Sequence, residues 1–417
     1  MNKPLSPFWT LFILTGLNLF NYLDRFVLSA VLPSLQNELH ISDGEAGRIV
    51  TAFMLGYFVT SPIFGYLGDR ASRKWLIAAG IFVWSLGTVL TGFAASLGIL
   101  LAYRVLVGLG EASYATISPS IISDTFAPSK RNNALTIFYV AIPVGAALGN
   151  ILGGQIAAHY SWREAFIWAG APGLLLALAL LPFKEPARGQ ADGGTGADNS
   201  TNKPRARDVF QLFKLGDYLL VVLGYTAYTF ALGAFGVWGP SFLHRIHNVP
   251  QDRAATFFGA VLVVAGLLGT LIGGFAATAW QKRNPAGYAL TLGLSVLGAV
   301  PVAVAAFLAV NTTLAMSCLA LAMFLLFLST GPVNTLILET VPVNLRSSAM
   351  AVSIFMIHLF GDMWSSEIVG QLSDSWHDLR KAVLILPVAL VVAALLWLAL
   401  AVKTIQQRTT SPAATTN

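Results

Sequence analysis

The sequence predicts an all-α membrane protein whose chain crosses the bilayer about twelve times. Hydrophobic residues make up 56% of the 417 residues and charged residues only 11%, and the mean hydropathy is +0.70. These values exclude a water-soluble globular protein of this length. The apolar runs reach the roughly 20 residues that a helix needs to span a membrane, and they do not alternate as barrel strands do.

The first apolar stretch is too long for the core of a signal peptide, and no small-residue cleavage site follows it, so we expect a retained span. The single cysteine, Cys318, lies inside a predicted span and offers neither an intrachain disulfide nor a metal cluster. The expected spans are residues 8–36, 45–66, 74–95, 97–123, 131–158, 163–182, 215–243, 254–279, 286–309, 313–338, 346–372 and 381–403.

The distribution of basic residues sets the expected orientation. Most of the 25 Lys and Arg residues fall in segments that share one side of the membrane, and only Arg25 and Arg104 lie well inside spans. Because basic loops stay on the cytoplasmic side, we expect both termini in the cytoplasm. The basic composition therefore reflects membrane insertion, and no nucleic-acid partner is expected.

The one long polar stretch divides the chain into two halves. It contains Gly189–Pro204, a Gly/Asp/Asn/Thr-rich segment typical of a flexible linker, and Arg207–Lys214, which could form a short amphipathic helix. The predicted domains are residues 1–183 with the first six spans, a cytoplasmic linker at 184–214, and residues 215–417 with the last six spans.

The two halves repeat each other weakly. Lys130–Phe138 matches Leu345–Ser353, as expected of transporters built from internal repeats. The fifth span of the first half is rich in glycine, with Gly145, Gly149 and Gly153 spaced four apart, which predicts close helix packing and a hinge.

Four charged residues lie inside spans of the first half. Asp24 and Arg25 are neighbours near the middle of the first span, about 100° apart around the helix, so they cannot both face one cavity squarely. Arg104 and Glu111 are seven residues apart in the fourth span, which places them on one face about 10 Å from each other. A charge near the bilayer centre costs several kcal/mol unless it is paired or hydrated.

These residues suggest a binding and coupling role. Arg104 could hold a phosphate or carboxylate with two hydrogen bonds, and Glu111 or Asp24, desolvated, could exchange a proton during transport. Glu111 is the favoured proton carrier because it shares a helix face with Arg104, whereas Arg25 beside Asp24 should keep that carboxylate ionised. The alternative is a static ion-pair network that ties the first and fourth spans together.

The second half lacks these charges. Its matching positions hold Ala231, Leu319 and Leu326. A packing role should be needed in both halves, so the asymmetry favours function. In the eleventh span, His358 and Asp362 are four residues apart on one face, and they could form a local pair or serve substrate or protons.

The candidate substrate-binding residues are Asp24, Arg25, Arg104, Glu111, Asn334 and His358.

The decapeptide GYLGDRASRK, Gly65–Lys74, falls where the second span ends and the third begins. Asp69 and Arg70 could pair with a neighbouring helix, while Arg73 and Lys74 would stay in water. A positive-inside loop alone would not explain the spacing G-x-L-x-D-R-x-x-R-K, which resembles the signature of the major facilitator superfamily. That resemblance implies two six-helix bundles around a central cavity. The expected gating residues are Gly65, Asp69, Arg70, Arg73 and Lys74.

Further segments resemble the spinster family of lipid transporters: Asn21–Phe26, Arg104–Phe126, Ile137–Gly149 and His358–Asp374. The resemblance implies alternating-access transport of a sphingolipid or lysophospholipid, with membrane lipids and possible proton coupling. Met363-Trp364 departs from the small residues expected there. Animal members are longer, so a bacterial homologue in the inner membrane is expected. The resemblance to the superfamily implies a monomer.

An amphipathic lipid also suits the sequence independently, because polar groups lie in one half and Phe, Leu, Val and Ala dominate the other. The alternatives are a proton-coupled organic-anion or sugar-acid symporter, and a receptor or scramblase of the same fold. We expect no enzyme and no cofactor, because nucleotide-binding, metal and nucleophile motifs are missing from the sequence.

Overall fold

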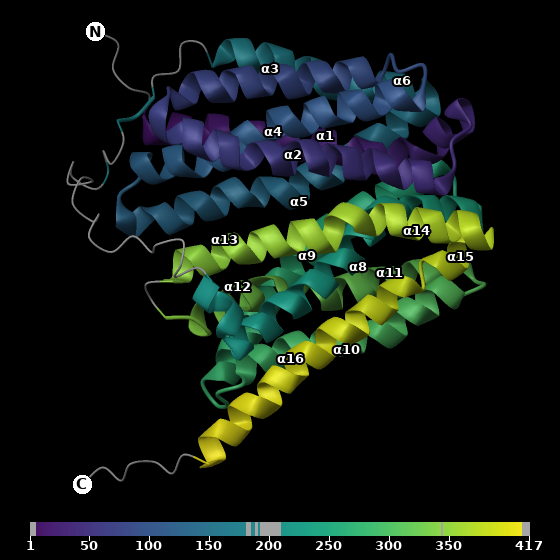
Figure 1. Ribbon diagram of the computed structural model, residues 1–417. Helices are drawn as coiled ribbons and strands as arrows, with labels where there is room; N and C mark the ends of the chain where they lie inside the picture. The colour runs from purple at the N-terminus through teal and green to yellow at the C-terminus, as the bar shows by residue number, and fades with distance from the viewer. Residues whose placement is uncertain (1–5, 181–184, 188–190, 192–209, 343–344, 411–417) are drawn as a thin grey trace. The chain divides into compact units, whose positions relative to one another are not determined.

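The computed structural model describes residues 6–180, 185–187, 191, 210–342 and 345–410, and all regular structure within them is helical (Figure 1). Ten of the described helices are long and apolar enough to cross a membrane. The sixth predicted span corresponds to a shorter helix, and the eleventh is interrupted. The predicted all-α membrane architecture is confirmed.

The first half of the chain forms six helices, several of them longer than the predicted spans. The second helix continues through Arg70, so most of the Gly65–Lys74 motif is helical and the turn itself is made by Ala71 and Ser72. The six helices are α1 (Pro7–Leu39), α2 (Asp43–Arg70), α3 (Arg73–Thr91), α4 (Leu97–Thr125), α5 (Pro128–His159) and α6 (Trp162–Ala179).

The second half begins with a single 3₁₀ turn at Phe210–Lys214, where an amphipathic helix over Arg207–Lys214 was expected. The Gly189–Pro204 stretch lies outside the described residues apart from position 191. The helices that follow are α8 (Gly216–His247), α9 (Gln251–Gln281), α10 (Gly287–Leu308), α11 (Thr312–Phe327), α12 (Thr330–Glu339), α13 (Arg346–Met356), α14 (Met363–Trp376), α15 (Leu379–Ala382) and α16 (Ile385–Thr410).

The chain divides into two compact units. Unit 1 comprises Met1–Thr201, Gly236–Val263 and Ser366–His377, so it joins the first six helices to parts of α8, α9 and α14. Unit 2 comprises the remaining segments, Asn202–Phe235, Val264–Ser365 and Asp378–Asn417. The division into domains at 184–214 stays a prediction.

Glycines bring the helices of unit 1 into close contact. Gly149 of α5 lies so near the backbone of Leu23 in α1 that an added Cβ would collide with it. Gly108 of α4 lies in the same way against the backbone of Phe53 and Tyr57 in α2. The packing role predicted for the glycines of the fifth span is therefore confirmed, and the same device fixes α2 against α4.

The predicted eleventh span is interrupted by a π-helical turn at Ile357–Asp362, between α13 and α14. A π turn shifts the backbone hydrogen bonds by one residue. Here the hydroxyl of Thr229 in α8 donates to the carbonyl oxygen of Ile357 at 3.3 Å. Gly361 also lies against Thr229, where a Cβ would not fit. Contact with α8 thus accommodates the irregular turn.

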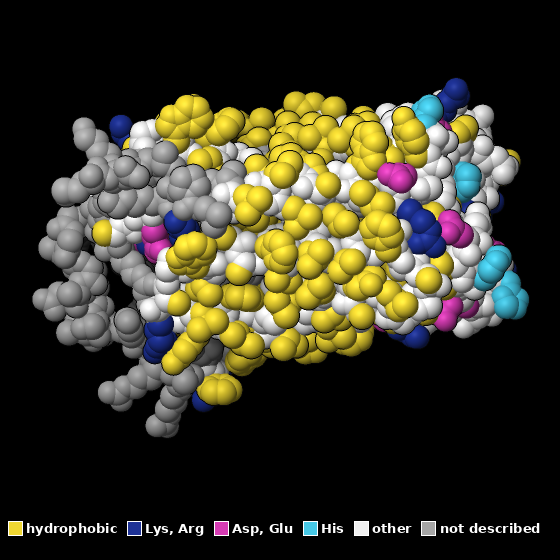
Figure 2. Space-filling model, turned by 90° about the horizontal axis from the view of Figure 1, so that it is seen from above, with side chains coloured by type: hydrophobic (Ala, Val, Ile, Leu, Met, Phe, Trp, Pro, Cys, Tyr) yellow, Lys and Arg dark blue, Asp and Glu magenta, His cyan; other side chains and the backbone are white. Residues whose placement is uncertain are grey.

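Large hydrophobic side chains cover the sides of the helices. In the face shown in Figure 2, yellow side chains occupy the middle of the helices, and charged and histidine side chains gather towards the ends. Phe12, Val59, Leu175 and Phe275 are among the strongly exposed residues. This distribution is that of a surface solvated by lipid tails rather than by water.

Candidate functional site: a buried charge cluster

The four predicted intramembrane charges come together inside unit 1. The Arg25 guanidinium of α1 donates to Oε2 of Glu111 in α4, from Nη2 at 2.6 Å and from Nε at 3.2 Å. On another side of α1, the carboxylate of Asp24 accepts a hydrogen bond of 2.6 Å from the hydroxyl of Thr88 in α3. As expected from the helix geometry, the two neighbours in sequence face different helices.

Arg104 is buried in the same cluster and forms no ion pair with the residues that the structure describes. Arg104 is 1% exposed, and its Nε and Nη1 have no hydrogen-bond partner among the described residues. Its charge lies within electrostatic range of Asp24 and Glu111. Its guanidinium carbon is 5.1 Å from the centroid of the Phe53 ring. A buried guanidinium with open donors has the chemistry to receive an anion.

The arrangement differs from the sequence expectation in one respect. Arg25 was expected to keep its neighbour Asp24 ionised, but its guanidinium pairs with Glu111 instead. The reason is the crossing of the helices, because the Arg25 side chain extends towards α2 and α4, where Tyr22, Phe53 and Tyr57 surround it. The pair does tie α1 to α4, as the static-network alternative requires.

Unit 2 has an apolar interior at the positions that match these charges. Ala231, Leu319 and Leu326 are all buried. Ala231 and Leu326 border a cavity of about 20 Å³ whose other walls, including Phe235 and Phe307, are also apolar. The asymmetry inferred from the sequence therefore holds in the packed interior.

The candidate residues of unit 2 make local contacts. His358 and Asp362 lie within the π-helical turn, with the imidazole Nδ1 3.1 Å from each carboxylate oxygen. Both side chains remain partly exposed, at 32% and 28%. The side-chain amide of Asn334 donates to the carbonyl of Thr330 in its own helix at 3.1 Å. A role for these residues in substrate binding stays a prediction.

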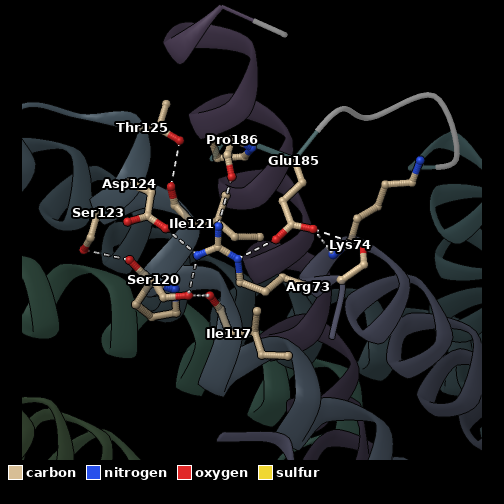
Figure 3. A network of polar contacts seen from close by, with 12 residues as sticks. Arg73, Lys74, Ile117, Ser120, Ile121, Ser123, Asp124, Thr125, Glu185 and Pro186 are labelled. Atoms are coloured by element: carbon tan, nitrogen blue, oxygen red, sulfur yellow. Dashed lines mark hydrogen bonds and ion pairs between the residues drawn. The ribbon is translucent and has the colours of Figure 1, made fainter. Parts of the chain in front are cut away.

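A second polar network lies where α2 turns into α3 (Figure 3). Arg73 is buried, contrary to the expectation that it stays in water. Its guanidinium donates to Asp124 of α4 at 2.5 Å, to Glu185 beyond α6 at 2.7 Å and to the carbonyl of Pro186 at 3.1 Å. The motif thus joins two helices of the first bundle to the start of the predicted linker.

Other residues of the motif behave differently from Arg73. Arg70 is exposed, and its guanidinium lies over the ring of Tyr66 in its own helix, 3.7 Å from the centroid, rather than pairing with a neighbouring helix. The ammonium of Lys74 lies 5.0 Å from the centroid of Trp75. The side chain of Asp69 lies outside the described residues. Gly65 and Gly68 belong to α2 and approach α4.

Glu185 is the carboxylate that accepts hydrogen bonds from Arg73, Ser72 and the backbone of Lys74 in this network. Partial burial would by itself raise the pKa of the Glu185 carboxyl, but hydrogen bonds from Arg73, Ser72 and the backbone of Lys74 outweigh burial and hold the pKa below its usual value of 4.5. A carboxylate at the first turn of α3 is also favoured by the helix dipole. The ionised form of Glu185 therefore stabilises the folded protein.

Sequence reasoning missed a third network, at the opposite ends of α1 and α2. The carboxylate of Asp43 at the start of α2 accepts hydrogen bonds from Gln36 of α1 at 2.8 Å, Arg245 of α8 at 2.6 Å and Ser373 of α14 at 2.5 Å. We call Gln36, Asp43, Arg245, Ser373 and Asp374 the Asp43 clasp. Its hydrogen-bonded members are separated by up to 331 residues in the chain, and the one local feature here is the capping box of Ser42 and Glu45 at the start of α2.

Asp374 completes the clasp by capping α2. Its carboxylate accepts the backbone N–H groups of Asp43 at 2.9 Å and Gly44 at 2.8 Å, which are otherwise orphan donors of the helix start. Next to the clasp, Arg48 pairs with Glu367 at 3.0 Å. A cavity of about 410 Å³ lined mainly by polar residues borders it. The contacts are polar, and although Asp43 and Ser373 are buried, the cavity lies beside them, so water can replace the contacts when the elements separate.

Comparisons with known proteins agree with this geometry. A model of the Major Facilitator Superfamily matches residues 14–365. The chain is 37% identical to protein spinster of Drosophila melanogaster over 89% of this chain, and it spans 62% of that protein's length. It is 34% identical to the sphingosine-1-phosphate transporter SPNS2 of Danio rerio, over 88% of this chain and 76% of the relative.

Solved structures give the same result for the fold. The chain is similar to the crystal structure of a bacterial homolog of the human lysosomal transporter Spinster in an inward-facing and occupied conformation. The TM-score is 0.86 at 25% identity, over 99% of this chain and 100% of that one. The fold is therefore that of a major facilitator. Within that superfamily, the chain belongs to the spinster family.

The Glu185 contacts lead to a prediction about stability and pH. Glu185→Gln should lower the free energy of unfolding at pH 7 by about 2 kcal/mol, because a charge-assisted bond to Arg73 is lost. The folded-state pKa is lowered, so this stabilisation is present above pH 4.5 and disappears as the pH falls through the folded-state value. Thermal unfolding in detergent should show the two melting curves converging in acid.

The control is Glu164→Gln, which makes the same chemical change at a carboxylate whose partner is the indole of Trp168, at 2.9 Å. Its offset from the parent should be smaller. A Glu185→Gln protein that is as stable as the parent at pH 7 would show that the Arg73 network does not depend on this charge.

Proposed function

We propose that the protein is a secondary transporter that moves an amphipathic lipid with an anionic or zwitterionic headgroup, of the sphingosine-1-phosphate or lysophospholipid type, across the membrane by alternating access. The observation that carries the proposal is Arg104, a fully buried guanidinium with two donors that have no partner among the described residues. A charge in that position is costly unless an anion uses it. Similarity to the sphingosine-1-phosphate transporter of Danio rerio supports a phosphate-bearing lipid.

The distribution of polar groups supports an amphipathic substrate. The charges lie in the first half of the chain, and the matching positions of the second half are apolar and buried. A lipid carries the same asymmetry, with a polar head and an apolar tail. A sugar acid would call for polar groups from both halves, so the organic-anion alternative is less well supported. A transporter of this kind needs no cofactor and performs no enzymatic step.

The two arginines offer the headgroup different access. The Arg25 side chain is 22% exposed, whereas Arg104 is almost completely covered. An incoming anion therefore meets Arg25 first and reaches Arg104 as the cluster rearranges. Removing Arg25 from Glu111 would leave that carboxylate without its counter-ion beside Asp24, and the cost of two buried negative charges links anion binding to proton uptake by the cluster.

The geometry changes the preferred proton carrier from Glu111 to Asp24. Glu111 is neutralised directly by Arg25, at 2.6 Å. Asp24 accepts from the neutral hydroxyl of Thr88, and its Oδ1 has no partner among the described residues. A buried carboxylate that accepts its hydrogen bond from a neutral hydroxyl, with no direct ion pair among the described residues, costs less free energy when it carries a proton. Both residues remain in the proposed coupling set, with Asp24 first.

The polar networks at the two ends of the bundle are proposed gates. The Gly65–Lys74 segment acts as a latch on the cytoplasmic side, where Arg73 connects it to Glu185 at the start of the linker. The Asp43 clasp acts on the opposite side, where it holds parts of α8 and α14 to α1 and α2. Both termini are cytoplasmic in this proposal, and the protein is a monomer in a bacterial inner membrane.

The headgroup assignment can be tested at Arg104. Arg104→Ala should weaken binding of a lysophospholipid by about ten- to hundredfold, since charge-assisted hydrogen bonds are lost. Arg104→Lys should recover only part of the affinity, because an ammonium cannot make the two-pronged contact. Ligand-induced thermal shifts of purified protein give the affinity, and the unliganded melting temperature controls for folding. Full affinity in Arg104→Ala would place the anchor elsewhere.

Proton coupling can be tested by transport in proteoliposomes with and without an imposed pH gradient. The parent should respond to the gradient, Asp24→Asn should lose the response, and Glu111→Gln should keep part of it. A parent that ignores the gradient would be a uniporter, and both carboxylates would then be structural. The reverse pattern in the two variants would return the proton to Glu111. Absence of saturable uptake in the parent would favour a receptor or scramblase.

The gating role of the Asp43 clasp can be tested by spectroscopic distances. Arg245→Gln removes the cation from Asp43 and should weaken the closed arrangement by about 1 kcal/mol, a roughly fivefold change in population. Nitroxides at His40→Cys and Ser375→Cys, in a Cys318→Ser background, report separation of α1 and α14. The control is Arg253→Gln, which changes an exposed arginine in the first turn of α9. Identical distance distributions in the two variants would contradict the role.

A further inference from the structure

One aromatic ring contacts both arginines of the charge cluster. The centroid of the Phe53 ring lies 4.8 Å from the guanidinium carbon of Arg25 and 5.1 Å from that of Arg104. The Phe53 residue is 2% exposed. The two cations come from different helices, α1 and α4, and the ring comes from a third, α2. No sequence motif pointed to this residue.

The backbone of Phe53 is fixed close to Arg104. Gly108, one turn along α4 from Arg104, lies directly against the carbonyl of Phe53, where any side chain would collide. Gly56 of α2 lies in the same way against the carbonyl of Val105. These two contacts bring α2 and α4 together at the level of the charge cluster. The ring therefore has little freedom to move away from the guanidinium groups.

Two guanidinium groups in a low-dielectric interior repel each other, so something must hold them in place. The face of an aromatic ring carries negative charge density and attracts a cation within about 6 Å of its centroid. Phe53 supplies this attraction to both arginines without accepting a hydrogen bond. The ring therefore occupies none of their N–H groups. Nε and Nη2 of Arg25 donate to Glu111, whereas Nε and Nη1 of Arg104 have no partners among the described residues.

An anion with several oxygens matches this arrangement. A phosphate group offers enough acceptor oxygens for two guanidinium groups at once, and a guanidinium presents its donors in a planar fork. A neutral headgroup would bring no anion to Arg104, two of whose donors have no partner among the described residues. The pair of arginines on one ring is thus suited to a phosphate-bearing headgroup.

We infer that Phe53 is a positioning residue that holds Arg25 and Arg104 as a two-guanidinium clamp for a phosphate-type headgroup. This inference rests on the proposed function, because it assigns the substrate class of the same cluster. If Phe53 only filled space in the core, any side chain of the same shape would serve equally well. The electrostatic character of the ring separates the two roles.

The test replaces Phe53 with phenylalanine analogues carrying one, two and three ring fluorines in the full-length protein. Fluorination withdraws negative charge from the ring face with little change of shape. Affinity for lysophosphatidic acid, measured by ligand-induced thermal shift, should fall stepwise to about one-tenth of the parent value. Affinity for the matching neutral monoacylglycerol should not change. The same series at Phe166, a fully buried ring of α6, is the control and should leave both affinities unchanged.

A conventional variant checks the result. Phe53→Leu should reduce lysophosphatidic acid binding more than Phe166→Leu does, even if both lower the melting temperature to a similar extent. Flat affinities across the Phe53 series would overturn the inference while leaving the proposed function in place, provided that Arg104→Ala still loses binding. A parent protein that binds neither lipid would contradict the proposed function, and the clamp with it.

Discussion

A charged side chain inside a membrane helix bundle needs a partner on a neighbouring helix, and the ion pair between Arg25 and Glu111 meets this need between α1 and α4. Among the described residues, the pair leaves Arg104 without a direct counter-ion, and Asp24 has a hydroxyl as its hydrogen-bond partner. Removing one member of a buried pair typically costs about 3–5 kcal/mol. In the proposed function, the charges of the cluster exchange pairing with one another for pairing with a ligand.

The same principle explains why the polar networks lie at the ends of the bundle. Arg73 joins α3, α4 and the chain beyond α6 at one end, and Asp43 joins α1, α2, α8 and α14 at the other. Hydrogen bonds that water can replace break at low net cost, whereas tight glycine-mediated contacts hold helices together. The contacts of Gly108 and Gly149 pack the helices of the first bundle closely. In the proposed function, the polar ends are where the elements separate.

Much of the fold follows from local sequence. Long apolar runs must become helices in a bilayer, since every backbone polar group needs an internal partner, and this predicted nearly all spans. The four charges of the cluster were also predictable, because charged residues stand out within apolar runs. The partner of each charge was not, since it depends on how α1 crosses α4. Arg25 follows Asp24 directly in the sequence, yet its side chain extends to Glu111 of another helix.

Other features lay beyond local patterns for similar reasons. The burial of Arg73 depends on Glu185, which is 112 residues away in the chain. The Asp43 clasp joins residues from both halves, and the π-helical turn at Ile357–Asp362 depends on a contact with Thr229. In the sequence, Phe53 has no feature that distinguishes it from an ordinary core residue. Its contact with two guanidinium groups emerges only when three helices are assembled.

The most direct measurement is an electron cryo-microscopy structure of the protein in lipid nanodiscs with a bound lysophospholipid. The account predicts the phosphate within hydrogen-bonding distance of the Arg104 guanidinium, with Arg25 displaced from Glu111 or shared with the phosphate. A phosphate bound elsewhere, with the Arg25–Glu111 pair intact and Arg104 still buried without an anion, would contradict it.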